Sequence, residues 1–266
     1  MRTAVALVRA CHPGPTAAVT VLAALLAVTA GHSAGQAALV ATAVLAGQLT
    51  VGWSNDLVDA DRDVATARRD KPLVTGEITR AALRRALVLA SAACVALSLA
   101  VGLLAGLVHL TLVAAAWAYN LGLKRTVWSW LPYVVAFGLL PAFSWLALDP
   151  PAMPPWWVMV VGSVLGFGAH LLNTLPDLDD DARTGVRGLP HRLGARRSSV
   201  LAVVALVAGT AVVVLGPAGT GPWWGWAVLA MSVLLSVGAL VLGGRAPFRA
   251  ALVIALLDVV LLVARS

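Results

Sequence analysis

The chain has 266 residues, of which 60% are hydrophobic and only 12% are charged, whereas an average soluble domain is roughly half apolar and about a quarter charged. Its mean hydropathy of +0.90 excludes an ordinary soluble domain, and it also excludes a disordered chain, which would be polar. The formal net charge of +7 leaves nucleic-acid binding or membrane topology as explanations, and the positions of Lys and Arg can separate the two.

Apolar runs between charges and Gly or Pro breaks predict nine membrane-spanning helices, each close to the roughly 20 residues that a bilayer requires. In chain order they cover residues 14–31, 36–54, 83–102, 105–122, 129–148, 156–174, 198–216, 222–243 and 247–264. We therefore expect an all-α, polytopic membrane protein with a single domain over residues 1–266. The first 35 residues also resemble a signal peptide, but their apolar run of roughly 18 residues is long for one and favours an uncleaved helix.

The basic residues fall almost entirely on one predicted side of the membrane. Those before the first helix and those in residues 55–85, 123–128, 175–197 and 244–249 make up 18 of the 19 Lys and Arg residues, and only Arg265 lies opposite. The positive-inside rule places the N-terminus and these segments in the cytoplasm. This topology accounts for the positive net charge, so we do not expect nucleic-acid binding.

Acidic residues are scarce, and eight of the twelve lie in two short segments, each of which follows an apolar run. The segments read NDLVDADRD over residues 55–63 and NTLPDLDDD over residues 173–181. Each contains an asparagine and two aspartates at intervals of four residues, namely Asn55, Asp59 and Asp63 in the first and Asn173, Asp177 and Asp181 in the second. Because residues at this interval share one face of a helix, we expect each set to line a helix face.

Carboxylates four residues apart on a helix repel each other unless a counter-charge is present. A divalent cation is a common counter-charge for such clusters, and Mg²⁺ often shares its carboxylate ligands with substrate phosphates. The segments could instead be polar caps where helices leave the membrane, but the repeated spacing favours a metal site. A calcium buffer is disfavoured because neither segment has the glycine and terminal glutamate of an EF-hand loop.

Basic residues accompany both acidic segments: Arg68, Arg69 and Lys71 follow the first, Arg183, Arg187 and Arg192 follow the second, and Lys124 and Arg125 lie between them. The positive-inside rule alone would also place these residues on the cytoplasmic side. Their closeness to the carboxylates suggests in addition that they bind a phosphate ester together with a metal ion.

With these motifs, the sequence resembles the UbiA superfamily of intramembrane prenyltransferases over residues 14–264. The family's first motif, NDxxDxxxD followed by a basic residue, Pro, Leu and Gly, is matched within residues 55–76 by Asn55, Asp56, Asp59, Asp63, Lys71, Pro72, Leu73 and Gly76. The second, DxExDxxxGxxTLPxxxG, is matched within residues 173–194 by Asp177, Asp179, Asp181, Gly185, Leu189, Pro190 and Gly194. A weaker third signature is matched by Tyr119, Lys124 and Arg125. The sequence departs from the family where Gly188 replaces Thr, Asp179 replaces Glu and Lys71 replaces Arg.

The resemblance implies a ring of about nine helices around a central cavity, with both acidic motifs at its cytoplasmic end and an opening toward the lipid bilayer. It implies Mg²⁺-dependent transfer of a prenyl group from an isoprenyl diphosphate to a lipophilic acceptor, aromatic or otherwise. The implied metal ligands are Asn55, Asp56, Asp59, Asp63, Asn173, Asp177 and Asp181. The implied diphosphate-binding residues are Asn55, Arg68, Lys71, Tyr119, Lys124, Asn173 and Arg192, and the implied catalytic residues are Asp59, Asp63, Asp177, Asp181 and Lys124.

Other interpretations stay open at this point. A terpene cyclase on the same scaffold would need no acceptor, and few polar residues are available to bind one, the candidates being Gln48, Ser54, His109, Tyr119, Ser144 and His170. A transporter is disfavoured because transporters place polar residues near the bilayer midplane, whereas these carboxylates lie at helix ends. His170 is either a proton acceptor or a buried hydrogen-bonding residue, and Asp258 is expected to make a structural hydrogen bond. The sequence does not indicate donor chain length, acceptor identity or oligomeric state.

Overall fold

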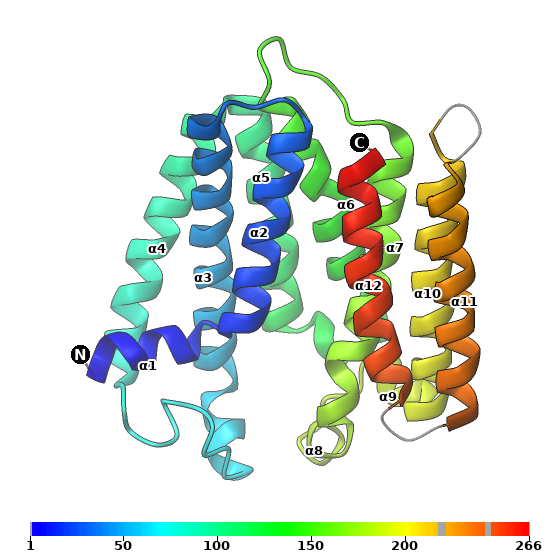
Figure 1. Ribbon diagram of the computed structural model, residues 1–266. Helices are drawn as coiled ribbons and strands as arrows, with labels where there is room; N and C mark the ends of the chain where they lie inside the picture. The colour runs from blue at the N-terminus through cyan, green and yellow to red at the C-terminus, as the bar shows by residue number, and fades with distance from the viewer. Residues whose placement is uncertain (1, 218–221, 243–245, 266) are drawn as a thin grey trace. The chain divides into compact units, whose positions relative to one another are not determined.

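The computed structural model describes residues 2–217, 222–242 and 246–265, and all regular structure in these residues is helical (Figure 1). This confirms the prediction of an all-α membrane protein. Seven helices of the described chain are long and apolar enough to cross a membrane, or eight if the bent pair Thr3–Ala10 and Pro13–Thr29 counts as one span. The count of nine spans therefore remains a prediction.

The first of two compact units consists of residues 1–122 and 143–152. Its helices are α1 (Arg2–Ala10), α2 (Pro13–Thr29), α3 (Ala34–Ala65), α4 (Arg80–Val101) and α5 (Leu103–Leu121). Within this unit α3 packs against α2, α4 and α5. Glycine permits one of these close approaches, because a Cβ atom at Gly47 would lie only 2.9 Å from Val113 of α5.

The length of α3 is what places the first acidic segment. α3 has 32 residues and so extends about 48 Å at ~1.5 Å per residue, well beyond a hydrocarbon core of about 30 Å. The sequence predicted a span that ends at residue 54, but the helix continues without a break to Ala65. Asn55, Asp59 and Asp63 therefore share a face of the last turns of α3, as their spacing predicted.

The second unit consists of residues 123–142 and 153–266. Its helices are η1 (Leu123–Arg125), η2 (Val127–Trp130), α6 (Leu131–Leu146, whose last turn belongs to the first unit), α7 (Trp156–Thr174), η3 (Leu175–Asp177), α8 (Leu178–Arg183), α9 (Leu189–Leu193), α10 (Ala195–Leu215), α11 (Trp223–Leu242) and α12 (Ala246–Arg265). α10 packs against α7, α11 and α12. The Thr210 hydroxyl of α10 donates a hydrogen bond to Asp258 of α12, in agreement with the structural role expected for this intramembrane carboxyl group.

The second acidic segment does not form one helix face, and here the sequence-based prediction is wrong. α7 ends at Thr174, a short 3₁₀ turn follows, and α8 begins only at Leu178. Pro176 lies in this turn. Proline lacks an amide N–H and its ring clashes with the preceding helical turn, and here the α-helix gives way to the 3₁₀ turn at this residue. Asn173, Asp177 and Asp181 therefore lie on three successive elements.

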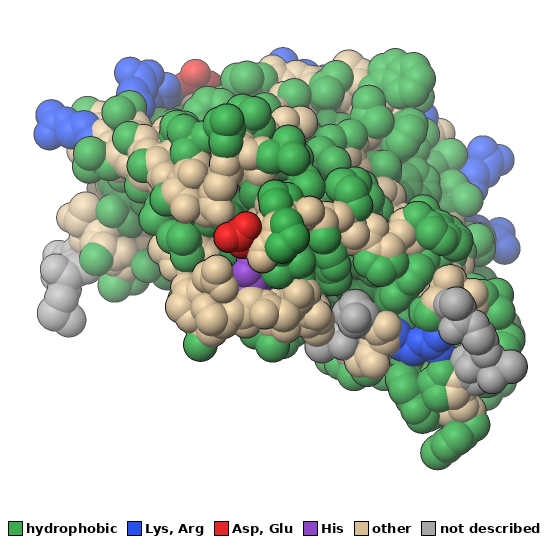
Figure 2. All heavy atoms as spheres, turned by 90° about the horizontal axis from the view of Figure 1, so that it is seen from above, with side chains coloured by type: hydrophobic (Ala, Val, Ile, Leu, Met, Phe, Trp, Pro, Cys, Tyr) green, Lys and Arg blue, Asp and Glu red, His purple; other side chains and the backbone are tan. Residues whose placement is uncertain are grey.

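Large apolar side chains are exposed on several helices of the described chain. Val88 and Leu89 of α4 and Val241 of α11 expose 67%, 71% and 82% of their surface. Apolar patches of this kind would drive association in water, whereas in a bilayer they face lipid. Figure 2 looks from above onto one end of the helices and shows a mainly hydrophobic face with few charged side chains.

Candidate active site

The first acidic segment presents three buried carboxyl groups at the end of α3. Asp56, Asp59 and Asp63 are only 1%, 2% and 4% exposed. An isolated buried carboxylate is strongly destabilising unless cations or hydrogen-bond donors compensate for its lost hydration. The contacts of these aspartates supply the cations and hydrogen-bond donors that compensate for this loss.

Asp59 is held by its own helix. Asn55 Nδ2 donates to Asp59 Oδ2 at 3.0 Å, and Arg62 Nη2 donates to the same oxygen at 2.9 Å. Arg62 Nε also lies 3.9 Å from Asp63 Oδ1. The sequence analysis did not select Arg62, although its position three residues after Asp59 indicated a contact on one helix face.

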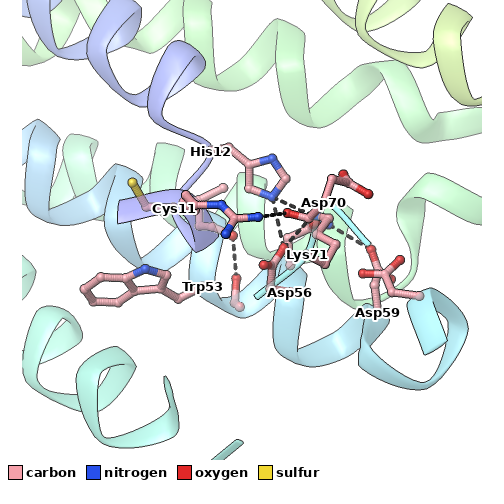
Figure 3. Close-up of polar contacts among 12 residues, drawn as sticks. Cys11, His12, Trp53, Asp56, Asp59, Asp70 and Lys71 are labelled. Carbon is pink, nitrogen blue, oxygen red and sulfur yellow. Dashed lines mark hydrogen bonds and ion pairs between the residues drawn. The ribbon is translucent and has the colours of Figure 1, made fainter. Parts of the chain in front are cut away.

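Asp56 pairs with a residue outside α3. Lys71 Nζ donates to Asp56 Oδ1 at 2.6 Å, and His12 Nε2 lies 3.1 Å from each of these two atoms. Figure 3 shows the three side chains pointing toward one another from the end of α3, from the segment that follows it and from the corner between α1 and α2. The second oxygen of Asp56 is buried and has no hydrogen-bond partner among the described residues.

The segment between α3 and α4 carries the basic residues predicted to bind diphosphate. Arg68 donates two hydrogen bonds of 2.9 Å to Asp70, and these lower the pKa of the Asp70 carboxyl below its ordinary value. Lys71 is 8% exposed and turns inward to Asp56. The structure therefore brings Lys71 into contact with a buried carboxylate of α3.

Asn120 of α5 is a site residue that the sequence analysis missed. Its Nδ2 donates to Val51 O and to Ser54 Oγ, both at 2.9 Å. Its Oδ1 accepts a 3.4 Å hydrogen bond from Asn55 Nδ2. Asn120 directly follows Tyr119, which the sequence analysis selected, but only the packing of α5 on α3 shows that Asn120 orients Asn55.

The second acidic segment lies in the second unit, and its side chains contact other residues of that unit. Asn173 Nδ2 donates to the hydroxyl of Tyr133 at 3.1 Å, and Asp181 Oδ2 lies 3.6 Å from His191 Nε2. Burial lowers the pKa of His191 below its ordinary value. Asp177 lies in η3, between these two residues in the chain. The side chains of Asp179 and Asp180 lie outside the described part of the structure.

A buried serine connects three parts of the second unit. Ser129 Oγ accepts a 2.9 Å hydrogen bond from the backbone N–H of Leu189, at the start of α9, and lies 3.0 Å from His170 Nε2. A Cβ atom at Gly188 would lie 2.7 Å from both Ser129 Oγ and the carbonyl oxygen of Lys124. The family's threonine at this position would therefore collide with the Ser129 hydroxyl, and glycine fits.

Lys124 is 5% exposed, and its backbone packs against Gly188. The Lys124 turn and the second motif are thereby fixed together. Arg192, by contrast, is exposed and donates a long 3.5 Å hydrogen bond to the carbonyl of Arg187. His170 is 1% exposed, and its contact with Ser129 supports the interpretation of His170 as a buried hydrogen-bonding residue.

The donor set of the first segment fits a hard divalent cation. Mg²⁺ prefers carboxylate and amide oxygens, which Asn55, Asp56, Asp59 and Asp63 supply, and one buried Asp56 oxygen has no hydrogen-bond partner among the described residues. The described residues contain no group of three or more His, Cys, Asp or Glu side chains arranged to hold a metal ion. Asp59 is held by Arg62, and Asp56 is held by Lys71 through Oδ1 only. Metal binding at the Arg62-bound oxygen of Asp59 would therefore require an exchange of partner, whereas the second Asp56 oxygen would not.

Comparisons with known proteins identify the family. The model of the UbiA prenyltransferase family matches residues 16–262. The bacteriochlorophyll synthase 33 kDa chain of Cereibacter sphaeroides is 33% identical over 230 residues, which are 80% of this chain and 66% of that relative. The match thus spans slightly less than two thirds of the relative's length.

Two solved structures resemble the fold closely. A structure of digeranylgeranylglyceryl phosphate synthase has a TM-score of 0.71 at 14% sequence identity. The match covers 100% of this chain and 99% of the synthase chain. A UbiA homologue from Archaeoglobus fulgidus bound to GPP and Mg²⁺ has a TM-score of 0.69 at 15% identity and covers 97% and 98%. At these identities the likeness shows the fold alone.

The packing at residue 188 gives a first prediction. Gly188→Ala places a methyl group against a backbone carbonyl and against Ser129 Oγ, and overpacking of this kind destabilises a protein by about 1–3 kcal/mol. The matched control is Gly238→Ala in α11, where a Cβ atom would meet nothing within 4 Å. Thermal melting of the purified variants should show a lower midpoint for Gly188→Ala and none of this loss for the control. Equal midpoints for the two variants would show that residue 188 is not tightly packed.

Proposed function

This chain belongs to the UbiA prenyltransferase family, and we propose that it transfers a prenyl group from an isoprenyl diphosphate to a lipophilic acceptor, with Mg²⁺, at the cytoplasmic side of a membrane. The observation that carries this proposal is the buried Lys71–Asp56 pair beside Asp59 and Asp63 at the end of a membrane-spanning helix. The lysine is a cation that can bind phosphate, and the aspartates supply oxygen ligands for Mg²⁺. Both lie where an apolar helix leaves the membrane. The Archaeoglobus fulgidus homologue bound to GPP and Mg²⁺ supports the same pairing of ligands.

Each acidic segment would supply oxygen ligands for Mg²⁺, the first unit through Asn55, Asp56, Asp59 and Asp63 and the second unit through Asn173, Asp177 and Asp181. When bound, Mg²⁺ would offset the negative charge of the diphosphate and so assist its departure. Arg62, which now neutralises Asp59, would then be able to turn toward the anionic substrate. Lys71 would stay on Asp56 Oδ1, and Asp56 would offer its second oxygen to the metal.

Lys71 and Lys124 would bind the diphosphate directly. Both lysines are buried, and an ammonium group removed from water interacts more strongly with an anion than an exposed one does. Negative charge grows on the diphosphate as its bond to the prenyl carbon breaks, so these contacts strengthen in the transition state and lower the barrier. Tyr119, Arg68 and Arg192 would add further hydrogen bonds to the diphosphate.

The prenyl group would leave as an allylic cation while its electron pair departs with the diphosphate. The apolar surroundings exclude water, which would otherwise capture the cation. An acceptor with a nucleophilic carbon or heteroatom would form the new bond and release a proton. Polar residues for binding such an acceptor are the least defined part of the site.

This scarcity supports a second candidate, a terpene cyclase in which the cation is captured by a double bond of its own chain. Several of the candidate acceptor-binding residues already contact other groups of the protein. His109 Nδ1 lies 2.7 Å from Ser98 Oγ, Ser54 Oγ accepts a hydrogen bond from Asn120, and His170 contacts Ser129.

One experiment separates the two functions. Purified protein in lipid nanodiscs is incubated with geranyl, farnesyl and geranylgeranyl diphosphates and Mg²⁺, first alone and then with a lipid extract as a source of acceptor. A prenyltransferase consumes a donor only when the acceptor is present, and a cyclase forms a cyclic hydrocarbon without it. Consumption of no diphosphate under either condition would contradict the proposed function.

The role of the buried lysines can be tested against an exposed basic residue. We expect Lys71→Ala and Lys124→Ala to lower turnover roughly a hundredfold, since one contact to developing charge contributes on the order of 3 kcal/mol. The control Arg85→Ala removes an exposed basic residue of α4 and should change turnover little. Rates are measured at saturating donor, with thermal melting as a check on folding. Equal rates for the three variants would show that the two lysines do not bind the diphosphate and serve only to orient the protein in the membrane.

The proposed orientation has its own test in intact cells. Single cysteines are introduced at Ala67 and at Ala152, both exposed, in a background in which Cys11 and Cys94 are replaced by alanine. Because basic residues favour the cytoplasmic side, a membrane-impermeant thiol reagent should label Ala152→Cys and leave Ala67→Cys unlabelled until the cells are opened. The reverse labelling pattern would place the acidic segments outside the cytoplasm.

A further inference from the structure

The corner between α1 and α2 holds a histidine in an uncommon backbone conformation. His12 has φ 57° and ψ 69°, in the left-handed region that residues other than glycine rarely adopt. A residue that precedes proline, as His12 precedes Pro13, normally adopts an extended conformation. Such a conformation persists only where the surrounding structure imposes it, and it is found preferentially at functional sites.

Contacts with α3 and α2 impose the conformation of this corner. The bend between α1 and α2 is 69°. The indole N–H of Trp53 donates to Leu7 O at 3.0 Å, and the hydroxyl of Thr16 donates to Cys11 O at 2.7 Å. The backbone of α3 comes so close that a Cβ atom at Gly52 would lie 2.6 Å from Cys11 O. The backbone next to His12 is thus fixed on α3.

An arginine ties α1 to the segment that carries Lys71. Arg9 Nη1 donates to both carboxylate oxygens of Glu77, at 2.7 and 2.6 Å, and Arg9 Nη2 donates to the carbonyl of Asp70 at 3.0 Å. α1 therefore fixes the backbone immediately before Lys71. The corner and the lysine segment are held in one arrangement.

This arrangement gives the Lys71 ammonium two fixed partners. Its Nζ lies 2.6 Å from Asp56 Oδ1 and 3.1 Å from His12 Nε2 (Figure 3). An ammonium group has three N–H donors and no acceptor, so an imidazole nitrogen 3.1 Å from it can only accept. We therefore assign the His12 proton to Nδ1, which leaves Nε2 as the acceptor, although Asp56 Oδ1 lies at the same distance from it. In the part of the chain that the structure describes, Asp56 and His12 account for two of the three donors, and the third remains for a ligand.

We propose that His12 is a positioning residue that, together with Asp56, orients the Lys71 ammonium so that its third N–H faces the diphosphate of the donor. The inference rests on the proposed function, in which Lys71 binds that diphosphate. A lysine side chain loses considerable rotamer freedom when it is held in one geometry. Because its two partners already hold the Lys71 side chain, this conformational entropy is lost on folding and not on substrate binding. Substrate affinity is therefore higher than it would be for a mobile lysine.

The informative variant is His12→Gly. Glycine adopts the left-handed conformation freely, so the corner should fold while the imidazole is removed. We expect kcat/KM for geranyl diphosphate to fall about tenfold, the size expected for one hydrogen bond to a charged group. His12→Gln, whose amide oxygen can accept from Lys71, should recover most of that loss. The matched control is Ala67→Gly, since Ala67 also has a positive φ, 52°, and it should leave kcat/KM unchanged.

A second measurement distinguishes positioning from general destabilisation. In a Lys71→Ala background, His12→Gly should cause no further loss, because the group it positions is already gone. An equal tenfold loss in both backgrounds, or no loss in the wild-type background, would overturn the role of His12 while leaving the proposed function intact. Absence of Mg²⁺-dependent turnover by the wild-type protein with any of the three diphosphates would overturn the proposed function and this inference with it.

Discussion

The buried ion pair between Lys71 and Asp56 is the interaction on which the candidate site of the first unit depends. A carboxylate that is 1% exposed is tolerated only if a cation compensates for its lost hydration. Lys71 supplies this compensation from a segment that has left the helix, so the ion pair fixes the fold of residues 66–79 relative to α3. The Arg9 contacts with Asp70 and Glu77 secure the same segment from the other side.

The same constraint governs the other buried polar groups of the described helices. A polar side chain within a membrane-spanning helix has little water available, so each needs a partner inside the protein. Asp258 accepts from Thr210, and Ser129 lies between His170 and the start of α9. These contacts hold helices together and leave the first acidic segment as the main concentration of buried charge among the described residues. A protein that must bind both a diphosphate and a prenyl chain needs these two environments.

The sequence predicted those features that depend on local periodicity. Apolar runs identified the helices, and the spacing of Asn55, Asp59 and Asp63 identified their shared face on α3. The regular spacing of the aspartates predicted one continuous helix through the second segment. Pro176 indicated the opposite, since proline disrupts helices, and the structure has a 3₁₀ turn there. His12 and Asn120 could not be found in this way, since their contacts with Asp56 and Asn55 join residues 44 and 65 positions apart. Such contacts follow from helix packing, which single-residue patterns do not specify.

The most direct test of the account is whether Mg²⁺ and a diphosphate bind together through the carboxylates of α3. A ligand that binds only the folded protein raises its melting temperature, so thermal melting of the protein in nanodiscs can be followed with Mg²⁺, with geranyl diphosphate, and with both. We predict a larger rise for the combination than for the two ligands separately, and loss of this excess in Asp59→Asn and Asp63→Asn. Equal stabilisation by geranyl diphosphate in Mg²⁺ and in EDTA, unchanged by either substitution, would contradict a metal-bridged diphosphate site.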